Sequence, residues 1–174
     1  MNLALRSFLS SLLLAATCLG AVEKPNLVVF ISDDLGRLDT SIHGSKDVRT
    51  PTMDLLAAKG MTFDDAYVAS PSCCPSRFSL LTGLMPARHG AHPNHSQVKP
   101  GTKFLMPILK KMGYHVASFG KVAHGNRDFE GMDFNNPKRT GMSVEVEKYF
   151  GTTKIDGPVC LLVGDRRPHV EWTK

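Results

Sequence analysis

Two adjacent cysteines, Cys73 and Cys74, lie in the stretch PSCCPSRFSLLTG and are followed at once by Pro75, Ser76 and Arg77. A buried core rarely needs two neighbouring thiols. We expect the cysteines to precede a helix, whose free backbone N–H groups favour anions. Arg77 would then lie one turn into the helix, able to meet an oxyanion or an activated nucleophile. The residues alone leave open a reactive or buried thiol beside a surface arginine.

A second chemical feature is the pair of carboxylates Asp33 and Asp34, which follow the apolar run NLVVFIS directly. Two adjacent carboxylates repel each other unless a cation lies between them. Ligation by oxygen alone suits calcium or magnesium. The alternative for this pair by itself is a helix cap beside a solvated acid.

The elements that must position these groups alternate along the chain. The run 26–32 is apolar and β-branched, and predicts a strand that is buried on both faces. Further strands are expected at 61–69, 114–120 and 158–164, helices at 50–60, 75–83 and 104–113, and a loop at 126–141. Alternating strands and helices predict an α/β fold with a largely parallel sheet flanked by helices.

Ligands of such sheets gather at the carboxyl ends of the strands. The polar residues after each apolar run should therefore share one edge of the sheet. These residues are Asp33, Asp34, Lys121, His124 and His169.

The stretch from Cys73 to Arg77, with Leu81-Thr82-Gly83 after it, resembles the sulfatase family signature, Cys-x-Pro-Ser-Arg followed by Thr-Gly. The resemblance implies an alkaline-phosphatase-like fold. It also implies that a maturation enzyme oxidises Cys73 to Cα-formylglycine. Cys74 then occupies the variable position.

The resemblance extends along most of the chain. NLVVFISDDLG is similar to the first family strand, whose two aspartates bind metal, and TPTMDLLAAKGMTFDDAYV resembles the helix and strand before the modified cysteine. GYHVASFGKVAHG resembles the second family signature and carries over Lys121 and His124. CLLVGDRRPHVEW resembles the later segment that supplies an active-site histidine, here His169. These stretches are most similar to the iduronate-sulfatase-like and heparan-sulfatase-like branch of the family. This resemblance implies sulfated carbohydrates such as glycosaminoglycans as substrates.

The resemblance also implies a metal site and a nucleophile. Asp33, Asp34 and the modified Cys73 would bind Ca²⁺, with Mg²⁺ as the alternative. The aldehyde at position 73 hydrates to a diol, of which one hydroxyl attacks sulfur and the other helps to expel sulfate. The metal would polarise the sulfate oxygens.

Four further side chains receive roles from the resemblance. Arg77 and Lys121 would stabilise the diol and the growing negative charge. His124 would hydrogen-bond the diol, and His169 would bind sulfate or protonate the leaving alcohol. The remaining histidines keep a structural or surface role, although two of them, at 89 and 92, could face the substrate cleft: His43, His89, His92, His95 and His115.

The N-terminal segment and the net charge indicate where the protein acts and what it could bind. Residues 1–21 read as an export signal with a short apolar core, which leaves 22–174 as the N-terminal part of a sulfatase catalytic domain. We expect an exported protein, periplasmic, secreted or lysosomal, with Cys18 as a weak lipoprotein attachment site. No later segment reads as membrane-spanning. The net charge of +5 is scattered and fits a solvated surface or an anionic substrate, not nucleic acid.

The sequence thus predicts a sulfatase that cleaves sulfate esters or N-sulfates of carbohydrates. Family members are usually more than twice as long as this chain. In those proteins, the part that has no counterpart here supplies further metal ligands. Two alternatives follow: a truncated, inactive sulfatase fragment, or a metal-dependent phosphohydrolase of the same superfamily.

Overall fold

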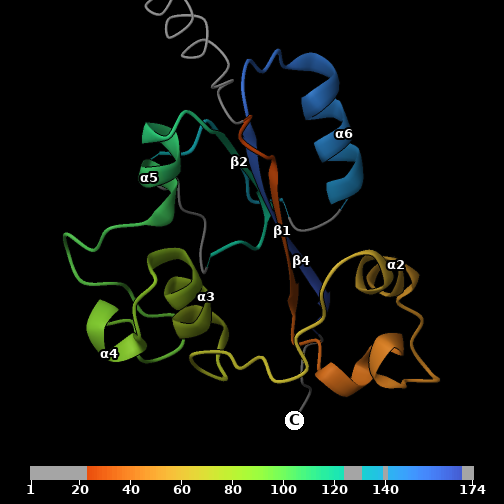
Figure 1. Ribbon diagram of the computed structural model, residues 1–174. Coiled ribbons are helices and arrows are strands. Elements are labelled where there is room, and N and C mark those ends of the chain that lie inside the picture. Colours follow the sequence, from red (N-terminus) through yellow and green to blue (C-terminus); the bar gives the residue numbers. More distant parts are fainter. Residues whose placement is uncertain (1–22, 124–130, 139–140, 170–174) are drawn as a thin grey trace, which may run out of the picture.

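The computed structural model describes residues 23–123, 131–138 and 141–169 (Figure 1). The predicted signal segment and His124 lie outside the described residues. Four parallel strands form one sheet in the order β1-β4-β2-β3. Their bounds are Leu27–Asp33 for β1, His115–Gly120 for β2, Phe134–Asn136 for β3 and Val159–Pro168 for β4. The predicted parallel sheet is therefore confirmed.

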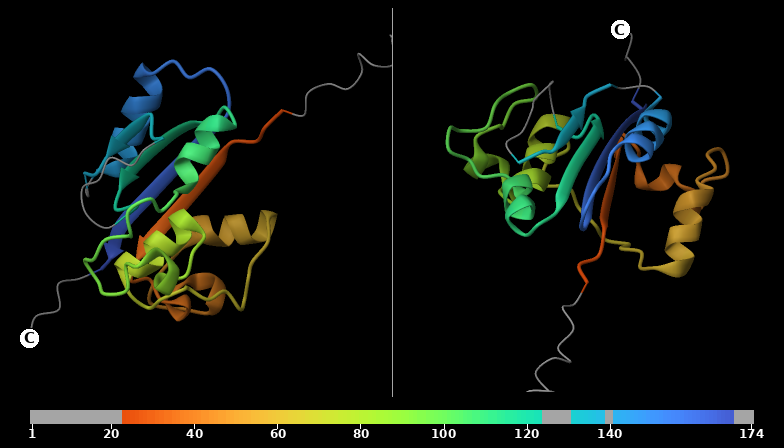
Figure 2. Two further views of the ribbon diagram at one scale, coloured as in Figure 1. Left: turned by 90° about the vertical axis from the view of Figure 1, so that its left-hand side faces the viewer. Right: turned by 90° about the horizontal axis from the view of Figure 1, so that it is seen from above.

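Helices flank the sheet on both faces (Figure 2). They are α2 (Pro51–Lys59), α3 (Cys73–Thr82), α4 (Pro86–His89), α5 (Leu105–Lys111) and α6 (Met142–Thr152), with the short 3₁₀ turns η1 (Arg37–Asp39) and η2 (Ser41–His43) after β1. Proline opens α2 and α4, where its missing N–H costs no hydrogen bond.

The core lies between the sheet and the helices α3 and α5. Leu81 of α3 and Met106 and Leu109 of α5 pack against Val116 of β2 and Leu162 of β4. On the opposite face, α6 contributes an aromatic contact.

That contact places Tyr149 of α6 over two strands of the sheet. Its ring lies 4.1 Å from that of Phe134 and 5.7 Å from that of Phe119, between ring centroids. The two layers of helices hold the strands β2, β3 and β4 in place.

Several element predictions were wrong. The segment 61–69 forms turns and no strand, because no neighbouring strand pairs with it among the described residues. Helix α3 begins at Cys73, so both cysteines lie in its first turn and do not precede it. The predicted loop 126–141 contains β3, and α6 after it was missed.

Strand β1 is less covered than its sequence predicts. Among the described residues it pairs only with β4, which leaves its other edge without a partner. The side chains of Val28 and Phe30 are 68% and 59% exposed. The prediction that this strand is buried on both faces is therefore wrong for the described chain.

Candidate active site

The carboxyl ends of β1, β2 and β4 meet at one edge of the sheet. The register of β1 and β4 shifts after Ile31, so that Asp33 pairs with Pro168. The next residues, Asp34 and His169, consequently lie side by side. The edge thus gathers the described residues that the sequence assigned to it.

Lys121 reaches this edge through an unusually close backbone approach between β2 and β4. Gly120 and Gly164 are register partners, and the N–H of Lys121 donates to the Gly164 carbonyl at 2.8 Å. A Cβ on Gly164 would lie only 2.0 Å from the Lys121 carbonyl oxygen. Only glycine fits at position 164 without moving the backbone.

Asp33 lies at the centre of the site and is only 2% exposed. Arg77 Nη2 donates to Asp33 Oδ1 at 3.0 Å, and Lys121 Nζ donates to Oδ2 at 2.5 Å. Burial by itself would raise the pKa of Asp33, but the hydrogen bond from Lys121 and the charge of Arg77 outweigh it. The pKa of Asp33 therefore lies below its usual value, and the carboxylate is charged.

Arg77 also ties the helix α3 to the strand ends. Its Nη1 donates to the Lys121 carbonyl, and its Nη2 lies 3.4 Å from the Ser32 carbonyl. The sequence predicted that Arg77 and Lys121 stabilise a diol at position 73. The structure places both cations on Asp33, and their predicted role towards the diol stays a prediction.

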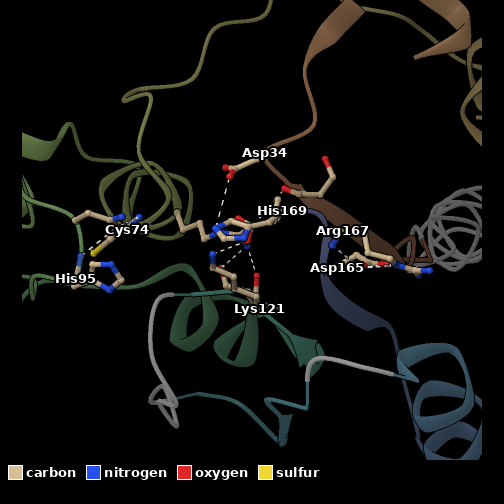
Figure 3. A network of polar contacts seen from close by, with 12 residues as sticks. Asp34, Cys74, His95, Lys121, Asp165, Arg167 and His169 are labelled. Carbon is tan, nitrogen blue, oxygen red and sulfur yellow. Dashed lines mark hydrogen bonds and ion pairs between the residues drawn. The ribbon is translucent and has the colours of Figure 1, made fainter. Parts of the chain in front are cut away.

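Asp34 and His169 form the second polar pair (Figure 3). His169 Nε2 lies 3.7 Å from Asp34 Oδ2, and His169 Nδ1 is buried without a hydrogen-bond partner among the residues that the structure describes. Asp34 has a φ of 62°, a left-handed conformation that aspartate tolerates better than most residues. The turn directs its carboxylate away from β1 and towards His169.

Cys73 completes a possible metal site with the two aspartates. One ligand atom from each of Asp33, Asp34 and Cys73 lies within 4.8 Å of the others. Cys73 opens α3 after Ser72, whose side chain does not cap the helix. The three residues line a cavity of about 550 Å³ together with Arg77. Two carboxylates beside a modified Cys73 fit a divalent cation.

Cys74 has a different environment from its neighbour. It is fully buried, its N–H donates to Asn94 Oδ1 at 3.3 Å, and its Sγ lies 3.3 Å from the Ser96 carbonyl. No disulfide forms among Cys73, Cys74 and Cys160. Cys74 therefore anchors α3 and does not face the cavity.

His89 does not line the cavity either, and its surroundings agree with the structural role expected from the sequence. It is fully buried, with Nε2 3.1 Å from Ser79 Oγ and Nδ1 accepting from the Ala91 N–H at 3.1 Å. His92 is exposed. The buried histidine holds α4 against α3.

The sequence analysis missed Asp165, which lies in the C-terminal half of β4. Its carboxylate is nearly buried and accepts bonds from Arg167 Nε at 3.2 Å and Nη2 at 2.7 Å. The pKa of Asp165 is lowered, mainly by the Arg167 hydrogen bond. The rule that located the other residues, a polar residue directly after a buried strand, also points to Asp165.

Within the described residues, no helix has the length and apolar character needed to cross a membrane.

Comparison with known proteins matches this arrangement to one family. The sulfatase family model matches residues 25–153. An ulvan-active sulfatase of Formosa agariphila is 30% identical over 86% of this chain and 31% of its own length. An N-acetylgalactosamine-6-O-sulfatase of Bacteroides thetaiotaomicron is 35% identical over 81% of this chain and 29% of its own length. The chain thus spans less than a third of these relatives.

Solved structures share the fold at lower identity. A protein in complex with its substrate D-glucosamine-2-N,6-O-disulfate superposes with a TM-score of 0.76 at 22% identity, over 87% of this chain and 36% of its own. The phosphonate monoester hydrolase of Agrobacterium radiobacter gives a TM-score of 0.68 at 18% identity, over 84% of this chain and 42% of its own. Since the family model matches well over half of the sequence, this chain belongs to the sulfatase family.

Proposed function

We propose that this polypeptide is the N-terminal part of a sulfuric ester hydrolase that cleaves sulfate esters or N-sulfates of carbohydrates. The observation that carries the proposal is the convergence of Asp33, Asp34 and Cys73 within 4.8 Å beside two buried cations. The sulfatases it resembles are named for N-acetylgalactosamine-6-sulfate and ulvan substrates. These names support a sulfated carbohydrate as the substrate class.

Asp33 and Asp34 would hold the metal, Ca²⁺ or Mg²⁺, together with the oxygen of a modified Cys73. Such a cation polarises sulfate oxygens and neutralises developing charge. Oxidation of Cys73 to formylglycine by a maturation enzyme would supply the hydrated aldehyde whose two hydroxyls attack sulfur and release sulfate.

The other side chains would prepare the site for an anion. Arg77 and Lys121 place two positive charges on the single carboxylate of Asp33, which leaves a positive excess in a buried region. That excess favours the negative charge that develops on a transferred sulfate group. His169, whose Nδ1 has no hydrogen-bond partner within the described part of the chain, would hold a sulfate oxygen or protonate the leaving alcohol.

We propose further that the described chain turns over little substrate by itself. Calcium takes six to eight oxygen ligands and magnesium about six. Two carboxylates and one hydroxyl leave about half of that shell to water, and loose positioning can cost about a hundredfold in rate. The exposed Val28 and Phe30 support a requirement for further polypeptide that covers this face, as does the edge of β1 that no described strand pairs with.

Two rival functions remain: an inactive fragment, and a phosphohydrolase. The phosphohydrolase is the weaker rival, because such enzymes place serine or threonine at the nucleophile position, where this chain has Cys73. The likeness to a phosphonate monoester hydrolase shows the fold alone.

The test begins with the modification. The chain is co-expressed with a formylglycine-generating enzyme, and the peptide around position 73 is analysed by mass spectrometry. We expect conversion of Cys73, with the adjacent Cys74 unconverted as an internal control. An unmodified Cys73 under these conditions would contradict the formylglycine proposal.

Activity is tested on the same material with aryl sulfate and aryl phosphate. A longer polypeptide that carries further metal ligands should hydrolyse the sulfate, and Cys73→Ala should abolish turnover. Preference for the phosphate ester would support the phosphohydrolase instead. Robust calcium-dependent sulfate turnover by the 174-residue chain would refute the requirement for further polypeptide and leave the sulfatase proposal standing.

Export is proposed as well. The short apolar run and the small residues that follow it support cleavage close to residue 21, so that the mature protein begins near Val22. N-terminal sequencing of secreted material checks this, and an intact Met1 would contradict it.

A further inference from the structure

We propose that, before Cys73 is oxidised, the pocket at the end of β1 binds a zinc-type cation in preference to calcium. The ligands would be the carboxylates of Asp33 and Asp34 and the thiolate of Cys73, with a water molecule in the fourth position. The inference concerns the unmodified chain and requires neither turnover nor maturation. It rests on where the ligand atoms lie, not on the proposed function.

The donor set matches zinc in type and number. Zinc is bound by cysteine sulfur, histidine nitrogen and carboxylate oxygen, almost always by four ligands in a tetrahedron. Asp33, Asp34 and Cys73 offer two oxygens and one sulfur within 4.8 Å of one another. Three protein ligands and one water molecule are a common coordination of zinc, so these three side chains suffice.

Only small movements are needed to close this set around an ion. Ligand atoms on a tetrahedral zinc ion are about 3.5 Å apart. The three atoms within 4.8 Å therefore have to approach by about 1 Å, which side-chain rotation can supply. The carboxylate of Asp34 is 46% exposed and is free to rotate.

The same set is a poor one for calcium. Calcium prefers six to eight oxygen ligands, whereas the unmodified pocket offers two carboxylates and a sulfur. Soft thiolate ligands select zinc and similar metals. Oxidation of Cys73 replaces the sulfur by oxygen, so the modification would change the metal preference of the pocket as well as its nucleophile.

The charges of the pocket balance with a bound dication. Two carboxylates and one thiolate around Zn²⁺ sum to −1, and the neighbouring Arg77 and Lys121 add two positive charges. The cations already bind one lone pair on each oxygen of Asp33, and a carboxylate oxygen can accept more than one partner. As the zinc–sulfur bond forms, the thiol proton passes to solvent.

Among the described cysteines, Cys73 is the one that can supply the thiolate ligand. The sulfur of Cys74 is buried and lies 3.3 Å from the Ser96 carbonyl. Cys160 is buried in the core of the sheet, and burial raises the pKa of its thiol. Neither can reach Asp33 and Asp34 without unfolding its surroundings.

The experiment uses the full chain produced without a maturation enzyme and stripped of metal. Co²⁺ and Cd²⁺ serve as spectroscopic probes for zinc, because their bonds to thiolate give charge-transfer absorption. We expect one equivalent to bind in the presence of excess Ca²⁺, with release of a proton. Cys73→Ser should remove the absorption band. The matched control is Cys74→Ser, which should keep the band.

A second measurement needs no variant and so does not depend on how a variant folds. Zn²⁺ should protect Cys73 of the unaltered chain from alkylation by iodoacetamide, and Ca²⁺ should not; peptide mapping separates this residue from Cys18. Equal alkylation with and without Zn²⁺ would overturn the proposal, as would an absorption band that survives Cys73→Ser. Because neither measurement involves turnover, failure here leaves the sulfatase proposal untouched, and the reverse is also true.

Discussion

Replacing Asp33 with asparagine should destabilise the fold far more than the same change at Asp34. Asp33 is 2% exposed and neutralises two nearly buried cations, Arg77 and Lys121. Removing one partner of a buried ion pair typically costs about 3–5 kcal/mol, because the remaining charge is left without compensation. Here two cations lose their shared partner, so we expect the upper part of that range.

The neighbouring carboxylate provides the matched control. Asp34 is 46% exposed, and its partner His169 lies 3.7 Å away. An exposed pair of this kind is worth about 0–1 kcal/mol. Asp34→Asn should therefore leave the free energy of unfolding almost unchanged.

Urea unfolding followed by far-ultraviolet circular dichroism measures both variants, with chelator present so that no metal contributes. Small domains have total stabilities of about 5–15 kcal/mol, so Asp33→Asn should bring the chain close to its unfolding threshold. The double variant with Lys121→Met should recover part of the loss, since it removes one of the two uncompensated cations.

The pH dependence of this effect follows from the sign of the shift. The pKa of Asp33 is lower in the folded chain than in the unfolded chain, despite its burial, because of Lys121 and Arg77. Its contribution is therefore fully present above about pH 4 and is lost as the pH falls through the folded value. If Asp33→Asn costs no more than Asp34→Asn at neutral pH, the buried triad does not hold the site together.

Three further outcomes are expected. Gly164→Ala should lower the free energy of unfolding in urea by about 1–3 kcal/mol, because the new Cβ would lie 2.0 Å from the backbone oxygen of Lys121. The control Gly151→Ala, whose Cβ would have nothing within 4 Å, should be neutral or stabilising. Equal effects of the two changes would contradict the close approach. Phe30→Ser should change stability by no more than about 0.5 kcal/mol and lower the aggregated fraction in sedimentation, because this side chain is exposed; a large loss of stability would show that it is covered. Hydrogen bonds outweigh the burial of Asp133 and lower its pKa, so its contribution to stability is lost at low pH. Asp133→Asn should therefore flatten the fall of the melting temperature below about pH 4. An unchanged dependence of the melting temperature on pH would count against this.

Much of the fold followed from local patterns in the sequence. The β-branched run that ends at Asp33, the proline at the start of α2 and the glycine after α3 are short-range signals, and each element they predicted is present. The helix α6 was missed although its more buried positions, Met142, Glu145, Val146 and Tyr149, follow a helical repeat. Its polar exposed face obscured that repeat.

The sequence by itself determined which residues could carry the chemistry. The spacing around Cys73 and Arg77, and the rule that polar residues after parallel strands share an edge, selected the aspartates, Lys121 and His169. These signals are local, and they depend on residue type and order alone. The roles assigned to these residues, and the metal, stay predictions.

The tertiary structure decided how those residues meet. The register shift of β1 against β4 places His169 beside Asp34. The close approach of Gly120, at the end of β2, to Gly164 within β4 brings Lys121 onto Asp33 together with Arg77. The exposure of β1 was likewise decided there, because a run of apolar residues signals burial without indicating what covers it. Pairing and register depend on contacts between segments distant in sequence, and no local pattern encodes them.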